Sequence, residues 1–149
     1  MKKTLSLLLT IISLLSFSAC SDNGRSEIST GLKQHYQNND LYFDYTTRDY
    51  NFRLPKYWEG RYIVEVSENS EKFYEINSYN KNETGLLFTI KQYEDNSYTK
   101  LKNYKILGKN AKTSYILELD ENEIFEAEFE EDFKSLKKGI SVIISTFNY

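Results

Sequence analysis

The C-terminal segment of the chain carries a helical pattern of large apolar residues. They recur every three or four positions, which places them on one face of an α-helix: Phe125, Phe129, Phe133, Leu136, Ile140, Ile143 and Phe147. Acidic residues dominate the start of this segment and lysines follow, an order that complements the helix dipole. The pattern predicts an amphipathic helix from about Glu126 onward. Gly139 weakens this helix by about 1 kcal/mol relative to alanine, so packing must compensate.

Upstream, the pattern changes to short runs of alternating or continuous apolar residues, which are typical of strands. These runs lie at 41–45, 50–54, 62–66, 72–77, 86–93, 103–107 and 113–119. Short polar turns join most of them, so antiparallel pairing is the economical arrangement. We therefore expect an α+β fold, a curved antiparallel sheet of about six or seven strands with the C-terminal helix packed on one face.

The breaks between the runs have local causes. Pro55 ends the second run because it has no N–H to donate to a neighbouring strand. The segment 56–60 then predicts a single helical turn, with Gly60 free to adopt positive φ. Residues 80–84 are expected to form a loop, and 108–110 the turn of the last hairpin.

Residues 1–20 have the order of an export signal. Lys2 and Lys3 precede an apolar run at 5–17, and Ser18, Ala19 and Cys20 follow it. This segment resembles the lipobox of bacterial lipoprotein signal peptides, although Phe17 stands where leucine is usual. The resemblance implies that 1–19 is removed and that Cys20 carries a diacylglyceryl thioether, with further acylation by fatty acids such as palmitate.

Two other interpretations of this segment stay open: an uncleaved signal anchor, or an ordinary signal with an incidental cysteine. The apolar run at 5–17 is 13 residues long, short of the roughly 20 that span a bilayer as a helix. Two acyl chains, by contrast, are enough for stable anchoring.

The chain after the signal divides into a tether and one domain. Residues 20–40 are polar and bury too little apolar surface to order themselves, so we expect a flexible tether, with a short helix at 27–36 as the alternative. Residues 41–149 are long enough for a single globular domain. Within it, 54–62 and 85–90 resemble uncharacterised small lipoproteins of Gram-positive bacteria, which implies a similar layered fold but carries over no catalytic residues.

Composition limits the function classes. The chain has 19 basic and 22 acidic residues, a net charge of −3. Removing Lys2 and Lys3 leaves 17 against 22, a net charge of −5. This acidic balance argues against nucleic acid as a partner and leaves the acyl chains as the membrane contact. Cys20 is the single cysteine, so the fold has no internal disulfide and depends on packing.

Few residues carry recognisable chemistry. His35, the single histidine, lies in the predicted tether, and an acylated Cys20 is no longer a nucleophile or a zinc ligand. The oxygen-rich segment 120–123 lacks the spacing of a calcium loop. We therefore expect no metal and no cofactor. Paired carboxylates remain as the basis of a hydrolase.

An aromatic group beside the predicted helical turn is the candidate partner-binding site: Tyr57, Trp58 and Tyr62. Tyrosine and tryptophan are enriched in interface hot spots. The alternative is that Trp58 plugs one end of the core, with Pro55 and Gly60 shaping the turn around it.

Together these features predict a lipoprotein of the cell envelope, anchored in the cell membrane through acylated Cys20 and facing away from the cytoplasm. Its domain is expected to be a non-catalytic binding or accessory module whose partner is an envelope protein or polymer. The alternative is an envelope hydrolase that uses paired carboxylates.

Overall fold

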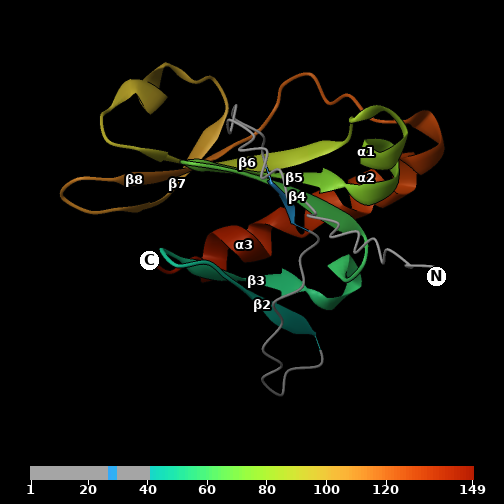
Figure 1. Cartoon of the computed structure of the whole chain (residues 1–149), viewed down its shortest axis with the longest axis horizontal. Coiled ribbons are helices and arrows are strands. Elements are labelled where there is room, and N and C mark those ends of the chain that lie inside the picture. The colour runs from blue at the N-terminus through green and yellow to red at the C-terminus, as the bar shows by residue number, and fades with distance from the viewer. Residues whose placement is uncertain (1–26, 30–40) are drawn as a thin grey trace, which may run out of the picture.

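The computed structural model describes residues 27–29 and 41–149, which form a main antiparallel sheet, a separate hairpin and a set of helices. The order across the main sheet is β1-β4-β5-β6-β8-β7 (Figure 1). Its strands are β1 (Glu27–Ser29), β4 (Tyr62–Ser67), β5 (Ser70–Glu75), β6 (Leu86–Tyr93), β7 (Tyr104–Lys109) and β8 (Ser114–Glu118). The hairpin consists of β2 (Tyr42–Thr46) and β3 (Asn51–Pro55).

The helices are short. The α-helices are α1 (Ile76–Asn82), α2 (Glu130–Lys138) and α3 (Ile140–Thr146). Three single turns of 3₁₀-helix accompany them: η1 (Lys56–Trp58), η2 (Ser97–Lys100) and η3 (Ala127–Phe129). Among the described residues, none of these helices has the length and apolar character needed to cross a lipid bilayer.

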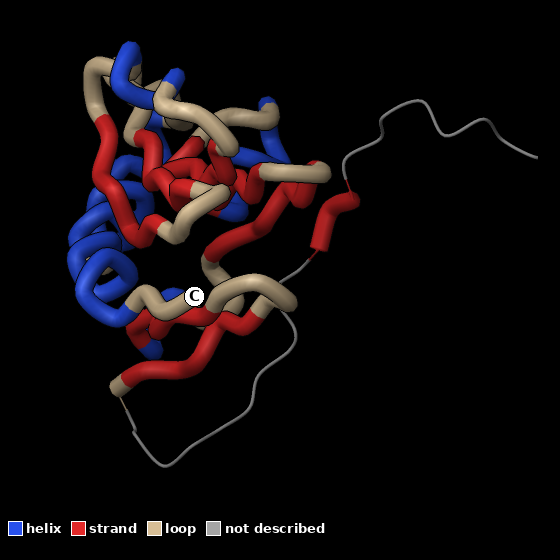
Figure 2. The backbone as a smooth tube through the Cα atoms, turned by 90° about the vertical axis from the view of Figure 1, so that its left-hand side faces the viewer, coloured by secondary structure: helices blue, strands red, loops and turns tan. Residues whose placement is uncertain are grey.

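One face of the main sheet is covered jointly by the hairpin and the C-terminal helices. Figure 2 shows the sheet and the hairpin as two layers, with helices closing one side of the space between them. The ring of Phe52 on β3 lies 6.0 Å from that of Phe73 on β5, and α3 packs beside β3. The α+β class, the antiparallel sheet and the helical cover are thus confirmed.

The predicted C-terminal helix is present but divided. Phe133, Leu136, Ile140 and Ile143 are all buried, as the spacing of apolar residues predicts. The α-helix begins at Glu130 rather than Glu126, and Gly139 separates α2 from α3. The two predicted strands nearest the N-terminus form the hairpin layer instead of joining the main sheet.

The prediction of a strand to 77 is wrong, because the chain turns into α1 after Glu75, and the loop predicted at 80–84 begins only after Asn82. The buried Glu75 carboxylate caps this helix by accepting hydrogen bonds from the amides of Asn77 at 2.9 Å and Ser78 at 2.7 Å. Glu83, with φ of 55°, ends the helix in the left-handed conformation. A glutamate that ends a strand and caps the next helix gives no distinctive pattern in the sequence.

Part of the predicted tether also has structure. Residues 27–29 form β1, which pairs with β4 from Val64 to Val66, so the alternative of a helix at 27–36 is wrong for these three residues. Cys20, His35 and the rest of the tether lie outside the described residues.

Candidate functional site

A cavity of about 250 Å³ lies between the turn of the β2–β3 hairpin and the turn that joins β4 to β5. Residues 47–50 supply one wall and 66–71 the other, while Ile90 and Gln92 of β6 complete the lining. Hydrogen bonds hold both walls in place. The hydroxyl of Thr47 accepts from the amide of Tyr50 at 3.1 Å, and the amide of Gln92 donates to the carbonyl of Asn69 at 2.9 Å.

Glu71 is the chemically distinctive residue of this cavity. It lies at the start of β5, on the sheet face that the hairpin covers, and two tyrosines of the hairpin region reach it. The hydroxyl of Tyr45 donates to Glu71 Oε2 at 2.9 Å, and the hydroxyl of Tyr50 is a second donor to the same carboxylate. Burial raises the pKa of Glu71, because desolvation outweighs the two hydrogen bonds, which act in the opposite direction.

The two tyrosine rings are held by the aromatic core. Tyr45 stacks on Phe52 with ring centroids 4.9 Å apart and meets the edge of Phe73 at 5.2 Å. Tyr50 is 5% exposed and lies 5.1 Å from the ring of Phe147. Burial, reinforced by the Glu71 charge, raises the pKa of both hydroxyls far above the usual value, so both remain protonated donors.

Charge around the cavity is unbalanced. Arg48 pairs with Asp49 at 3.2 Å, and its side chain is 91% exposed. Glu68 lies on the exposed β4–β5 turn. Among the side chains of residues 41–149, none that is cationic forms an ion pair with Glu71. Within the described residues, the cavity therefore contains a partly desolvated carboxylate that has hydrogen-bond donors but no counterion.

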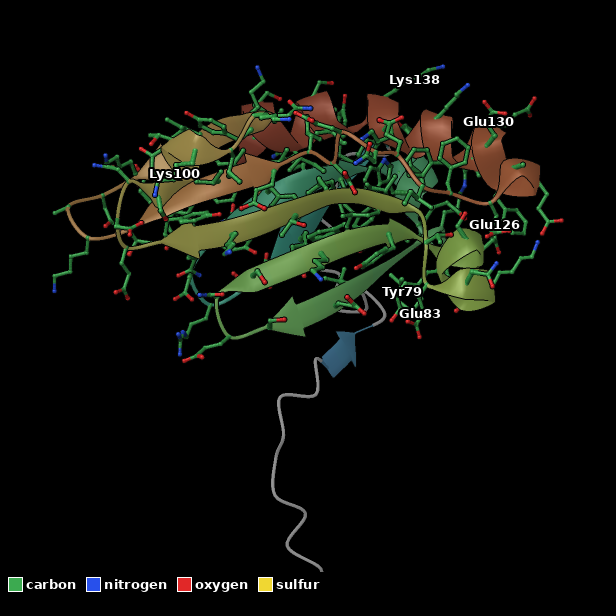
Figure 3. All side chains as sticks on the ribbon, turned by 90° about the horizontal axis from the view of Figure 1, so that it is seen from above. Tyr79, Glu83, Lys100, Glu126, Glu130 and Lys138 are labelled. Carbon is green, nitrogen blue, oxygen red and sulfur yellow. The ribbon has the colours of Figure 1, made fainter. Side chains whose placement is uncertain are left out.

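On the opposite face of the sheet, Glu65 has surroundings similar to those of Glu71, but a lysine lies close to it. The hydroxyls of Tyr74 and Tyr79 each donate to the Glu65 carboxylate at 2.9 Å, and Lys72 Nζ lies 4.0 Å from it. Figure 3 shows Tyr79 beside the sheet, on α1. Glu65, like Glu71, thus accepts hydrogen bonds from two tyrosines, but it also has a lysine nearby. This makes Glu65 a matched control for Glu71.

A second cavity, of about 410 Å³, lies on this opposite face over β6 and β8. Its carboxylates have partners. Tyr93 donates to Glu118, Lys102 lies 3.4 Å from Glu121, and Asp120 accepts from the amide of Asn122 at 2.9 Å. Within the described part of the chain, no three acidic, histidine or cysteine side chains are placed to hold a metal ion. This cavity is larger and contains an ion pair between Lys102 and Glu121, whereas Glu118 and Asp120 have neutral hydrogen-bond donors and no ion pair within residues 41–149.

The predicted aromatic site is divided between core and surface. Trp58 has 0% exposure and Tyr62 has 5%, whereas Tyr57 is 43% exposed and its hydroxyl donates to the carbonyl of Ser135 at 3.3 Å. Trp58 packs against Tyr62 and Phe88, with ring centroids 5.7 and 6.1 Å away. The structure thus agrees with the interpretation of Trp58 as a core plug and leaves Tyr57 as the surface residue of the three.

Sequence reasoning missed Glu71 entirely. The residue lies in a polar stretch, 67–72, that predicts a solvated turn, and its two tyrosine partners are 21 and 26 positions away in the chain. The sequence contains only a weak indication that Glu71 is covered: it lies two positions before Phe73, so the two side chains share one face of the strand. No family model, curated protein or solved structure matches this chain.

Glu71→Gln is expected to raise the free energy of unfolding by about 0.5–2 kcal/mol at pH 8, because glutamine still accepts the tyrosine hydrogen bonds without a buried charge. The pKa of Glu71 is raised in the folded protein above its ordinary value of 4.5. Protonation therefore favours folding, and the wild type loses this contribution as the pH rises through the folded pKa.

The gain from Glu71→Gln should thus vanish near pH 4, where Glu71 is protonated in the wild type as well. Urea denaturation of both proteins from pH 4 to pH 8 measures the difference in their free energies of unfolding at each pH. A variant less stable than the wild type at pH 8 contradicts this prediction.

Proposed function

We propose that this protein is a lipoprotein of the cell envelope, anchored in the cell membrane through acylated Cys20 on the extracytoplasmic side. Its domain acts as a non-catalytic binding module, and the cavity at Glu71 is the binding site. The observation that carries the proposal of a binding site is Glu71 itself, a carboxylate that is partly desolvated and has no counterion among the residues that the structure describes. Residues that reduce stability in this way are typical of functional sites.

The contacts in the cavity favour binding over hydrolysis. Glycoside hydrolysis by carboxylates needs one carboxylic acid and a second carboxylate free to act as nucleophile or base. The Asp49 carboxylate in the same cavity already forms an ion pair with Arg48, its neighbour in the hairpin turn. The rigid tyrosines fix Glu71 as a hydrogen-bond acceptor, a role suited to recognition.

A hydrolase remains the second candidate function, because Glu71 has a raised pKa and shares its cavity with Asp49. If it were the correct one, Asp49→Asn and Glu71→Gln would each abolish cleavage of an envelope glycan. We expect no such cleavage by the purified wild-type protein, measured as release of reducing ends.

Substituting Cys20 tests the anchor. We expect that cells labelled with a radioactive fatty acid incorporate label into the wild-type protein and that Cys20→Ser abolishes this incorporation completely, because the thiol is the acceptor. The wild-type protein should fractionate with membranes and the variant should not. An intact N-terminus or an unmodified Cys20 in the mass spectrum of the membrane-bound protein contradicts the anchor.

Affinity capture tests the binding site separately. The lipidated protein is recovered from its own membranes as wild type, as Gln92→Trp, which places a large side chain in the cavity, and as Lys102→Trp, which changes the other cavity. We expect a partner that Gln92→Trp loses and Lys102→Trp keeps. Retention of the same partner by Gln92→Trp contradicts the assignment of the site.

A further inference from the structure

We propose that the cavity at Glu71 binds a primary ammonium group carried on a short alkyl chain. This inference rests on the proposed function, since it names the ligand class of the same site. The argument starts from the carboxylate. Glu71 accepts hydrogen bonds from Tyr45 and Tyr50, and a carboxylate has about four acceptor positions. Two positions therefore remain for donors that enter through the cavity.

The charge of the entering group follows from what surrounds Glu71. A desolvated carboxylate without a counterion is unfavourable, and a cation in contact with it removes that penalty. The other charged side chains that line the cavity are Asp49, Glu68 and the outward-pointing Arg48. An anionic ligand would meet three carboxylates here, whereas a cation meets one arginine that is already paired.

The shape of the ligand follows from the walls. Val66 is half-buried and lies opposite Glu71 on the neighbouring strand, and the almost fully buried Ile90 and Tyr50 complete this part of the lining. An alkyl chain fits against Val66, and an ammonium group near the edge of a tyrosine-lined cavity gains a cation–π contribution where it reaches the ring. A volume of about 250 Å³ suits a small group rather than a whole sugar chain or nucleotide. A lysine side chain has this chemistry, as does a free alkylamine.

Titration with defined probes tests the inference. The purified full-length protein, labelled with ¹⁵N and held in detergent micelles, is titrated with N-acetyl-lysine methylamide, n-butylammonium and N-acetyl-norleucine methylamide. The norleucine compound has the alkyl chain without the ammonium group. Chemical-shift changes at the backbone amides of Thr47 and Asn69, which line the cavity, report binding there. The expected dissociation constant for the lysine compound is on the order of 1 mM.

The variants form a matched pair. Glu71→Gln should weaken binding of the lysine compound at least about tenfold, as expected for the loss of a hydrogen bond to a charged group. Glu65→Gln, which changes the equivalent tyrosine-bound carboxylate on the opposite face, should bind like the wild type. Because Glu71→Gln is expected to be more stable than the wild type, its loss of binding does not reflect unfolding.

Each outcome is decisive. Binding of the lysine compound but not of n-butylammonium supports the inference and identifies a peptide-borne lysine as the source, and binding of both supports it for any alkylamine. Equal binding of the norleucine compound, or full binding by Glu71→Gln, overturns it. The inference also fails if neither amine changes the chemical shifts of the cavity amides at concentrations up to about 20 times the expected dissociation constant. The capture experiment with Gln92→Trp can still succeed in that case, which separates a wrong ligand class from a wrong site.

Discussion

Trp58→Ala is expected to lower the free energy of unfolding by about 3–5 kcal/mol, the cost of removing a large aromatic side chain from a packed core. The side chain has 0% exposure and lies among Tyr62, Phe88 and Gly139, where the hairpin layer and the C-terminal helices meet. Its loss leaves a cavity bounded by β4, β6 and the C-terminal helices. All three would have to move to fill it, so the surrounding structure can relax only a little.

Chemical denaturation measures the effect, and the adjacent residue supplies the control. Tyr57 is 43% exposed, and its hydroxyl donates a hydrogen bond to the carbonyl of Ser135. Tyr57→Ala should therefore cost about 1 kcal/mol or less. Equal destabilisation by the two substitutions would mean that Trp58 does not have the central packing role assigned to it.

Gly139→Ala is expected to destabilise the protein by about 1–3 kcal/mol, although alanine favours a helix over glycine by about 1 kcal/mol. The backbone of Gly139 is right-handed, with φ of −74°, so its conformation does not require glycine. Space is the constraint. A Cβ atom at this position would lie 2.4 Å from Trp58 Nε1, 2.9 Å from the Tyr57 hydroxyl and 3.0 Å from Pro55 Cγ.

A double-mutant cycle tests this cause. Trp58→Phe removes the indole nitrogen, which is the nearest atom and has no hydrogen-bond partner among the described residues. In that background the cost of Gly139→Ala should fall, giving a coupling energy of about 0.5–3 kcal/mol by thermal or urea denaturation. Gly139→Ala that stabilises the wild type, as helix propensity alone predicts, would show that α2 and α3 are free to move away from the indole.

The same contact explains why a glycine stands at the point where the predicted helix is divided. The apolar spacing from Phe125 to Phe147 is visible in the sequence, and so is the glycine that interrupts it. The reason for the glycine is not, because Trp58 precedes Gly139 by 81 positions and approaches it only when the hairpin and the helices cover the same face of the sheet. Glycine is unfavourable for the helix at this position, but packing against Trp58 requires it.

Glu71 and Glu65 show the same limit at the candidate site. Both are glutamates in strands, and both accept hydrogen bonds from two tyrosines. Their difference arises from the alternation of side chains along β4 and β5, which places Glu65 with Lys72 on one face and Glu71 beneath the hairpin on the other. Beyond its spacing from Phe73, nothing in the sequence around Glu71 indicates that it is partly desolvated.

The alternation of apolar residues along the strands and the helical spacing at the C-terminus determined, without further information, the class of the fold, the antiparallel pairing and the buried face of the helices. These patterns are local, because each strand or helix must bury its apolar side, and the pattern is the same whichever element covers that side. Only the tertiary structure decided what covers it: a separate hairpin beside the helices, Trp58 against Gly139, and a glutamate enclosed with two tyrosines. Those features depend on contacts between residues far apart in the chain, and such contacts leave no periodic pattern in the sequence.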